Sequence, residues 1–259
     1  MRPFSRKSIC GVKTKILLAT LVACSSFGFA PSASAQIAVN AVTRTMLPNQ
    51  RPIENVDVSN FSENRILQTN IIAEQSLINE DGTERVIPTT DFLVAPASMI
   101  LRPGEMKKAR LVLRKPPSDK EERYYRVTFK AAIPDPLRLQ QMGLDQAEVD
   151  AQNALSANIS MISGMGIFVT VAPKEINPKL TWTRDAKAIH FKNEGNTSIE
   201  MRLRKEYCFD GNKNDCISLP YQRIYPGKSW SYEIGGDKPI VYYYKVYDRT
   251  EKAIIGAVK

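Results

Sequence analysis

The chain reads ISMISGMGIFVTVAP from Ile159 to Pro173, and this stretch decides how the fold is interpreted. At the two-residue period of a β-strand, one side carries apolar residues with a single serine among them. The sequence also places glycines at 164 and 166, where a core strand normally has branched side chains. Two interpretations stay open on this stretch alone: an ordinary buried strand, or a strand that lends its apolar side chains to another polypeptide.

Short alternating segments precede this stretch and favour an antiparallel sandwich. In the segment 123–131, Tyr125, Val127 and Phe129 share an apolar face, whereas Arg126 and Lys130 lie on the polar one. No long amphipathic helix interrupts the series. The predicted strands cover residues 36–45, 53–60, 65–75, 92–95, 99–101, 109–114 and 123–131.

A long connection, residues 133–158, then breaks the rhythm, and its part 144–157 has the composition of a short helix. Connections of this length inside a compact domain are usually functional or mobile. After Pro178 a second set of short strands is predicted, enough for another sandwich. These strands cover residues 180–182, 188–192, 199–207, 217–223, 229–234, 239–247 and 253–258.

The first 35 residues have the pattern of a cleavable export signal. They hold five basic residues, no acidic residue and an apolar run, and they end in Ala33-Ser34-Ala35. Their removal lowers the formal net charge from +9 to +4, so most of the basicity belongs to the signal. A lipoprotein site at Cys24 is the second-ranked alternative. We therefore expect an exported protein; the periplasm as its compartment is what the family resemblance described below implies.

Two cysteines remain after removal of the signal, Cys208 and Cys216, on either side of a loop rich in turn-forming residues. In an oxidising compartment this pair predicts a disulfide. A metal site is not expected, because the single histidine, His190, lies in a strand-like segment far from the cysteines in sequence. We interpret His190 as structural.

The sequence gives little support for catalysis or for nucleic-acid binding. It contains no glycine-rich phosphate loop, no H-E-x-x-H and no C-x-x-C, and its order suggests no Ser/His/Asp arrangement. It also lacks a pronounced cationic stripe. We expect no enzyme, no cofactor, no small-molecule substrate and no nucleic-acid partner.

Several segments together carry a resemblance to a known family. They are Thr43-Arg44, VAPASMILRPG at 94–104, KEERYYRVTF at 120–129, GIFVTVAP at 166–173, YCFDGNKNDC at 207–216 and YPGKSW at 225–230. In order and spacing, the chain resembles the periplasmic pilus assembly chaperones of the chaperone-usher pathway. The similarity is closer to the alternative branch, which serves colonisation-factor and common-pilus fimbriae.

This resemblance implies two immunoglobulin-like domains in an L-shaped arrangement with a cleft between them. The domain boundaries we expect are residues 36–172 and 173–259 after a signal peptide at 1–35. The implied partners are pilus subunits and an outer-membrane usher, and a second copy of the chain is to be considered when no subunit is bound.

The resemblance also gives the stretch after residue 158 a role. Pilus subunits of this pathway lack their last strand, and the chaperone fills the open groove with its own strand by β-augmentation. The side chains expected to enter the groove are Ile159, Met161, Ser163, Met165 and Ile167. Methionine suits such a donor because it is unbranched and adaptable.

In the main branch of the family, a basic pair holds the terminal carboxylate of the subunit. Arg44 matches the first member, and a guanidinium can bind a carboxylate through two hydrogen bonds. The second member, a lysine near the end of the donor strand, has no counterpart here. Arg126 is our substitute and Lys130 a weaker one, although either cation could simply be solvated.

A second class of function is kept as the alternative: a secreted two-domain β-sandwich adhesin or structural fimbrial protein. It predicts a stable free protein that no subunit depends on. A chaperone instead predicts a partner subunit that aggregates when this chain is absent.

Overall fold

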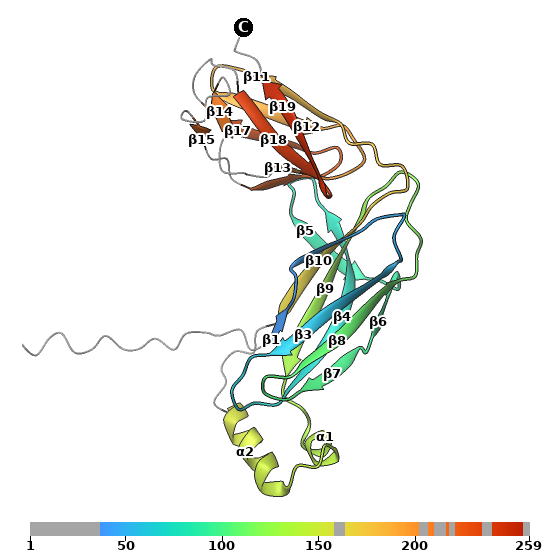
Figure 1. Ribbon diagram of the computed structural model, residues 1–259, viewed down its shortest axis with the longest axis vertical. Helices are drawn as coiled ribbons and strands as arrows, with labels where there is room; N and C mark the ends of the chain where they lie inside the picture. The colour runs from blue at the N-terminus through green and yellow to red at the C-terminus, as the bar shows by residue number, and fades with distance from the viewer. Residues whose placement is uncertain are drawn as a thin grey trace, which may run out of the picture. The chain divides into compact units, whose positions relative to one another are not determined.

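The structure is a computed structural model that describes residues 37–157, 164–201, 207–209, 216–217, 221–234 and 240–255. Strands dominate the described residues, which contain two helices. The strands form four sheets, two from residues 37–171 and two from residues 180–255 (Figure 1). The predicted all-β class with two β-sandwiches is confirmed.

The N-terminal sandwich has a four-stranded sheet and a six-stranded sheet. The first has the order β1 (Ile37–Val39), β3 (Ile53–Asn60), β8 (Met106–Leu113) and β6 (Phe92–Ala95). The second has the order β2 (Thr43–Met46), β10 (Met165–Val171), β9 (Arg123–Ala132), β4 (Leu67–Ile78) and β5 (Glu84–Pro88), and β7 (Ser98–Leu101) also pairs with β4. Every described pair in these two sheets is antiparallel except β2 with β10.

The core lies between these sheets and follows the period of two predicted for the strands. Tyr125, Val127 and Phe129 of β9 are fully buried in it. Val56 on β3 and Leu111 on β8 are buried in the same core from the other sheet. Burial of apolar side chains at alternate positions therefore holds the two sheets face to face.

One predicted strand, 36–45, is in fact two. β1 pairs with β3 in the first sheet, whereas β2 pairs with β10 in the second. Between them Asn40 is held at β3, where its backbone N–H donates to Asp57 O (3.2 Å) and its side chain to Asp57 Oδ2 (3.1 Å). A chain that changes sheets must leave one ladder before it joins the next, which splits the strand.

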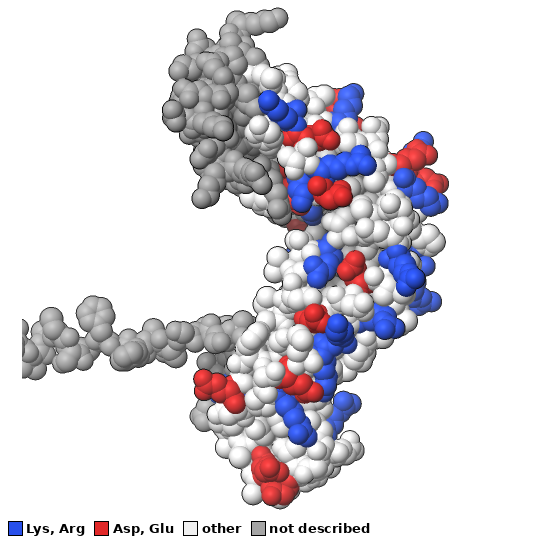
Figure 2. All heavy atoms as spheres, viewed as in Figure 1, with Lys and Arg blue, Asp and Glu red and all other residues white. Residues whose placement is uncertain are grey.

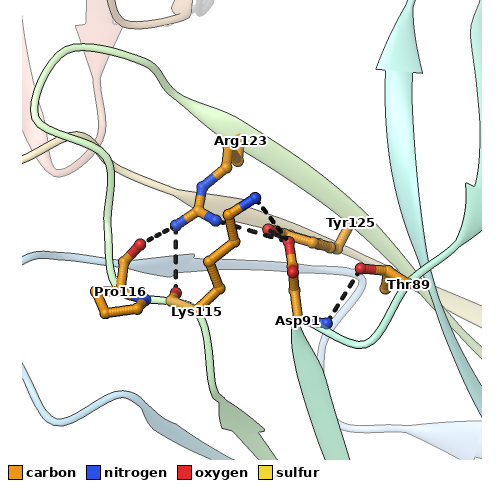
Figure 3. Close-up of polar contacts among 6 residues, drawn as sticks. All are labelled: Thr89, Asp91, Lys115, Pro116, Arg123 and Tyr125. Carbon is orange, nitrogen blue, oxygen red and sulfur yellow. Dashed lines mark hydrogen bonds and ion pairs between the residues drawn. The ribbon is translucent and has the colours of Figure 1, made fainter.

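A polar cluster lies where β6 and β9 begin (Figure 3). Asp91 accepts a hydrogen bond from the Tyr125 hydroxyl (2.7 Å) and forms ion pairs with Arg123 (3.6 Å) and Lys115 (3.9 Å). Arg123 also donates to the carbonyls of Lys115 and Pro116. Burial, with the bond to Asp91, raises the pKa of Tyr125. The cluster gives buried charges partners at the edge of an apolar core.

The long connection between β9 and β10 folds into two short helices, α1 (Pro136–Gln141) and α2 (Gln146–Ala157). Asp135 caps α1 through the Leu137 N–H (2.8 Å), with proline in the first turn. Asp145 and Glu148 form a reciprocal capping box at the start of α2, 2.9 Å in each direction. The helix predicted at 144–157 is confirmed, and neither described helix is long and apolar enough to cross a membrane.

The C-terminal sandwich has a three-stranded and a six-stranded sheet around its own core. The first has the order β11 (Leu180–Arg184), β12 (Ala188–Asn193) and β17 (Ser229–Glu233). The second has the order β15 (Cys216–Ile217), β14 (Tyr207–Phe209), β18 (Ile240–Val246), β13 (Ile199–Met201) and β16 (Gln222–Ile224), with β19 (Arg249–Ile255) paired to β18. Phe191 and Tyr242 pack edge to face at its centre, with ring centroids 5.3 Å apart.

Glu122, at the start of β9, links residues of the two sandwiches. Its carboxylate accepts hydrogen bonds from the Tyr124 hydroxyl, the Tyr247 hydroxyl (2.7 Å) and the Ser198 backbone N–H (2.7 Å). Burial first, and then the Glu122 charge, raises the pKa of both Tyr124 and Tyr247. Three donors thus satisfy a carboxylate that is only 8% exposed.

Candidate functional site

The site is built around β10, whose two ends differ in their neighbours. β9 pairs with β10 along its whole length, from Met165 opposite Phe129 to Val171 opposite Arg123. β2 pairs with the other edge only from Phe168 onward. Within the described residues, no strand pairs with that edge between Met165 and Ile167. Unpaired backbone groups at this edge can extend the sheet with another chain.

One face of β10 belongs to the domain's own core. Ile167, Val169 and Val171 are fully buried there, and Met165 is partly exposed. The expectation that Ile167 fills a partner's groove is corrected by this observation, because its side chain already packs in the core of its own sandwich. Of the expected donor residues, Met165 is thus the one the structure describes outside that core.

The other expected donor residues, Ile159, Met161 and Ser163, lie outside the described residues. Their assignment stays a prediction from the sequence and the family resemblance.

The opposite face of β10 carries Gly166, Phe168 and Thr170, and we call it the Phe168 face. The guanidinium of Arg126, from β9, lies 5.4 Å from the centre of the Phe168 ring. The guanidinium of Arg223, from β16, lies 5.2 Å from the same ring centre. Two cations on one aromatic ring make this face the most distinctive arrangement of charge on β10.

The two glycines have a packing reason that the sequence did not reveal. A Cβ atom at Gly164 would lie 2.8 Å from the Phe129 carbonyl oxygen, which is too close. At Gly166 a Cβ atom would meet the Arg126 side chain at 3.4 Å. Gly164 therefore permits the close approach of β10 to β9, and Gly166 leaves space for Arg126 on the Phe168 face.

Arg126 is held on this face by Glu84. Its Nε donates to Glu84 Oε1 (3.1 Å), and its Nη2 donates to Glu84 Oε2. Partial burial works against ionisation of Glu84, but hydrogen bonds from Arg126 and Ser76 outweigh it and lower the pKa of Glu84. No hydrogen-bond partner is found for Arg126 Nη1 within the described residues, so this nitrogen is free to bind an anion there.

Arg223 is the residue that sequence reasoning missed. Its Nη2 donates to Glu200 Oε1 (2.8 Å), and its Nη1 reaches Thr170 Oγ1 on β10 at 3.4 Å. Burial opposes its charge, yet Glu200 prevails and raises the pKa of Arg223. No local motif marks this arginine, because its partners on β10 lie more than fifty residues away in the sequence.

Arg44 does not join this arrangement. In the parallel pairing with β10 it lies opposite the buried Val169, so its side chain projects from the other face of the sheet. There its Nε lies 3.6 Å from Glu54 Oε2, and its Nη2 donates to Asn40 Oδ1 (3.3 Å). The expected pairing of Arg44 with Arg126 is therefore not present.

Lys130 shares its face of β9 with Arg126 but lies four residues further along the strand and is exposed. At the strand rise this separates the two residues by roughly 13 Å. Lys130 is therefore placed beyond the ring of Phe168.

A cleft of about 520 Å³ adjoins the Phe168 face. Tyr124 connects the two, because it stacks on Phe168 at 5.8 Å and meets Tyr225 edge to face at 5.0 Å. Both tyrosines line the cleft, with Lys120 and Lys228 among the other lining residues. Glu121 and Glu122 also line the cleft, but four cations outnumber them, so the aromatic rings and the net positive charge suit a peptide segment with a negative charge.

The cysteine and histidine predictions fall in the C-terminal sandwich. Cys208 and Cys216 are directly opposite each other in the pairing of β14 with β15. Their side chains lie outside the description, so the disulfide stays a prediction that this register supports. His190 is exposed and contacts Ser231 Oγ (2.8 Å) and Asp185 Oδ2 (3.0 Å). Within the described residues, no group of three metal-ligating side chains is found.

Residues 37–165 match the family described as pili and flagellar-assembly chaperone, PapD N-terminal domain. The chain belongs to this chaperone family. The match begins at β1 and ends at the first residue of β10, so it covers the N-terminal sandwich up to this strand, and Phe168 lies just beyond it. The family consists of assembly chaperones and not of enzymes, and it does not favour the adhesin alternative.

Solved structures show the same two-domain fold. The class 5 fimbriae chaperone CfaA is 22% identical, with a TM-score of 0.56 over 86% of this chaperone and 99% of that chain. A chain of the CsuC–CsuE chaperone–tip subunit complex of Acinetobacter baumannii is 13% identical, with a TM-score of 0.54 over 87% and 100%. A chain of the SafA pilin–SafB chaperone complex of Salmonella enterica is 14% identical, with a TM-score of 0.52 over 85% and 96%. A comparison with curated protein sequences finds no match.

Proposed function

We propose that this chaperone binds, folds and caps fimbrial subunits in the periplasm by donor-strand complementation and delivers them to an outer-membrane usher. The observation that carries the proposal is the edge of β10 at Met165–Ile167, with which none of the strands that the structure describes pairs, and which continues the apolar alternation that begins at Ile159. An added strand on that edge would satisfy backbone groups, and alternate side chains would fill pockets of the subunit.

The donor side chains in this proposal are Ile159, Met161, Ser163 and Met165. Ile167 is left to the core, where it is fully buried. The similarity to the class 5 chaperone CfaA supports placing this chain in the alternative branch, which serves colonisation-factor and common-pilus fimbriae.

We place the subunit's terminal carboxylate on the Phe168 face, with Arg126 as its main ligand and Arg223 beside it. Arg126 offers its Nη1 on the same side of the sheet as the cleft-lining Tyr124. Arg44 would first have to leave Glu54 and Asn40 and reach around the sheet edge. A hydrogen bond from a guanidinium to a carboxylate is charge-assisted, and therefore short and strong.

Maturation is part of the proposal. Cleavage after Ala35 would leave a domain of residues 36–172, a second of 173–259, and a disulfide between Cys208 and Cys216. The intact mass of the periplasmic protein tests the cleavage site and the disulfide, and a lipid adduct on Cys24 would contradict cleavage after Ala35.

The decisive experiment is co-expression with a candidate pilin and recovery of a 1:1 complex from the periplasm. We compare wild type with Met161→Asp, which places a charge on the donor strand, and with His190→Ala, a control on the exposed face of β12. Met161→Asp should lose most of the complex, because an apolar groove does not accept an unpaired carboxylate. Equal recovery of all three proteins, with the pilin stable alone, would instead support a free-standing adhesin.

A further inference from the structure

The connection before the donor segment is folded and docked, which the proposed function does not require. α1 and α2 lie against the loop between β3 and β4 and against β7 (Figure 1). A helical pair on a connection of this length can also extend into solvent, so the contacts that dock it need a physical reason.

Gln152 is the polar contact that docks α2. Its Oε1 accepts a hydrogen bond from the Ile66 backbone N–H (3.0 Å), and its Nε2 donates to the Asn64 backbone carbonyl (3.0 Å). One amide side chain thus forms hydrogen bonds with a donor and with an acceptor of the same loop. This double contact fixes the orientation of α2 as well as its distance from the loop.

An apolar contact lies beside it. Leu139 of α1 and Val149 of α2 are fully buried and form a small cluster with Ile66, against which Ile100 of β7 also packs. Arg102 Nη2 also donates to the carbonyl of Met142, at 3.4 Å. Undocking would expose these side chains to water, which opposes it.

The loop that receives the insert is itself fixed to the sandwich. The buried Asn60 side chain donates to the carbonyls of Arg65 (2.7 Å) and Leu101 (3.0 Å) and accepts from the Ser62 N–H (2.9 Å). α2 is therefore attached to a rigid part of the domain. Its last residue, Ala157, is separated from the start of β10 by seven residues, 158–164.

We propose that the docked α1–α2 insert is a positioning element, with Gln152 as its key residue, that holds the start of the donor segment and so raises affinity for the subunit. This inference rests on the proposed function. With the insert docked, the connection from α2 to β10 has seven residues, 158–164; with it released, the connection that begins at β9 has 32 residues, 133–164. By loop-closure entropy this difference corresponds to a roughly tenfold weaker complex.

The test compares Gln152→Ala with Asn153→Ala, which removes an exposed amide from the next position of the same helix. For each protein we measure the dissociation rate of its complex with a pilin that binds wild type, and hydrogen exchange at the Ile66 amide. Gln152→Ala should speed dissociation by up to about tenfold and should also speed exchange at the Ile66 amide, which loses its acceptor; Asn153→Ala should change neither. Gln152→Glu, which can accept from Ile66 but cannot donate to Asn64, should fall between them.

The proposal is overturned if Gln152→Ala releases the Ile66 amide to exchange but leaves dissociation unchanged. It is also overturned if exchange at Ile66 does not increase, since Gln152 then does not hold α2. Met161→Asp is measured alongside to distinguish the two proposals. If Met161→Asp loses the complex, the donor-strand function stands and only the positioning role of the insert is wrong. If its complex is unaffected, the donor-strand function is wrong too.

Discussion

The two faces of β10 are built from one strand of seven residues but differ in composition and in role. The core face carries Ile167, Val169 and Val171, all fully buried in the N-terminal sandwich. The Phe168 face carries a glycine, an aromatic ring and a threonine, with guanidinium groups on the ring. The comparison shows that apolar alternation marks the part of the strand that stabilises the fold, whereas the charged site lies on the other face.

A substitution on the core face should have the largest effect, a loss of stability of the folded protein. Ile167→Ala removes buried atoms that the sandwich cannot fully replace, and we expect it to lower the free energy of unfolding by about 2 to 5 kcal/mol. Ile72→Ala is the matched control, because Ile72 lies on the opposite face of the same sheet and is 39% exposed. Urea unfolding of both variants measures the difference. An Ile167→Ala protein as stable as wild type would return Ile167 to the donor set.

The second prediction compares two arginines on opposite faces of the sheet. Arg126→Gln should weaken the complex with a pilin about 10- to 100-fold, the range expected for loss of one hydrogen bond to a charged group. Arg44→Gln should change it less, because Arg44 is bound to Glu54 and Asn40 on the other face. Dissociation constants from titration of purified proteins decide between them. A larger loss for Arg44→Gln would move the carboxylate site away from the Phe168 face.

A third, smaller effect is expected from the aromatic ring itself. Phe168→Leu keeps an apolar side chain but removes the stack with Tyr124 and the two cation–π contacts. We expect the free energy of unfolding to fall by about 1 to 2 kcal/mol. Phe61→Leu is the control, since Phe61 is 66% exposed. If both substitutions had the same effect in thermal unfolding, the ring would not organise this face.

The smallest expected effect is the pH dependence of the stability that Glu84 contributes. Burial opposes ionisation of Glu84, but hydrogen bonds from Arg126 and Ser76 outweigh burial and lower its pKa. The interactions of ionised Glu84 therefore stabilise the folded protein fully above the ordinary carboxyl pKa. This stabilisation is lost as the pH falls through the lowered pKa of the folded state. The stability difference between wild type and Glu84→Gln should be below about 1 kcal/mol at pH 7 and should shrink in acid. Glu121→Gln, on an exposed residue, is the control. A difference that grows in acid would contradict this account.

Much of the fold could be predicted from local patterns. The strand predicted at 53–60 is β3 to the residue, and the alternation of Tyr125, Val127 and Phe129 identified the buried face of β9. These two predictions succeed because the period of two along a strand determines which side chains face the core. The strand β5 and the helix α1 were missed, although Asp135-Pro136 is a recognisable start for a helix.

The site was predicted less well, because it depends on contacts between distant segments. Arg126 was placed on the correct face of β9 by its period, but its contact with Glu84 spans 42 positions in the sequence. Arg44 has the residue type expected for an anchor, yet the parallel register with β10 turns it to the other face. A side chain's type is local, whereas its neighbours are decided by strand pairing.

By itself the sequence determined the all-β class, the boundaries of several strands, the helix at 144–157 and the family resemblance, since each follows from short-range periodicity or from motifs in order. Only the tertiary structure decided that Ile167 belongs to the core, that residues 37–46 serve two sheets and that Arg223 reaches Phe168. The physical reason is that these three features depend on which strands lie side by side, and strand pairing brings together residues that no local pattern connects.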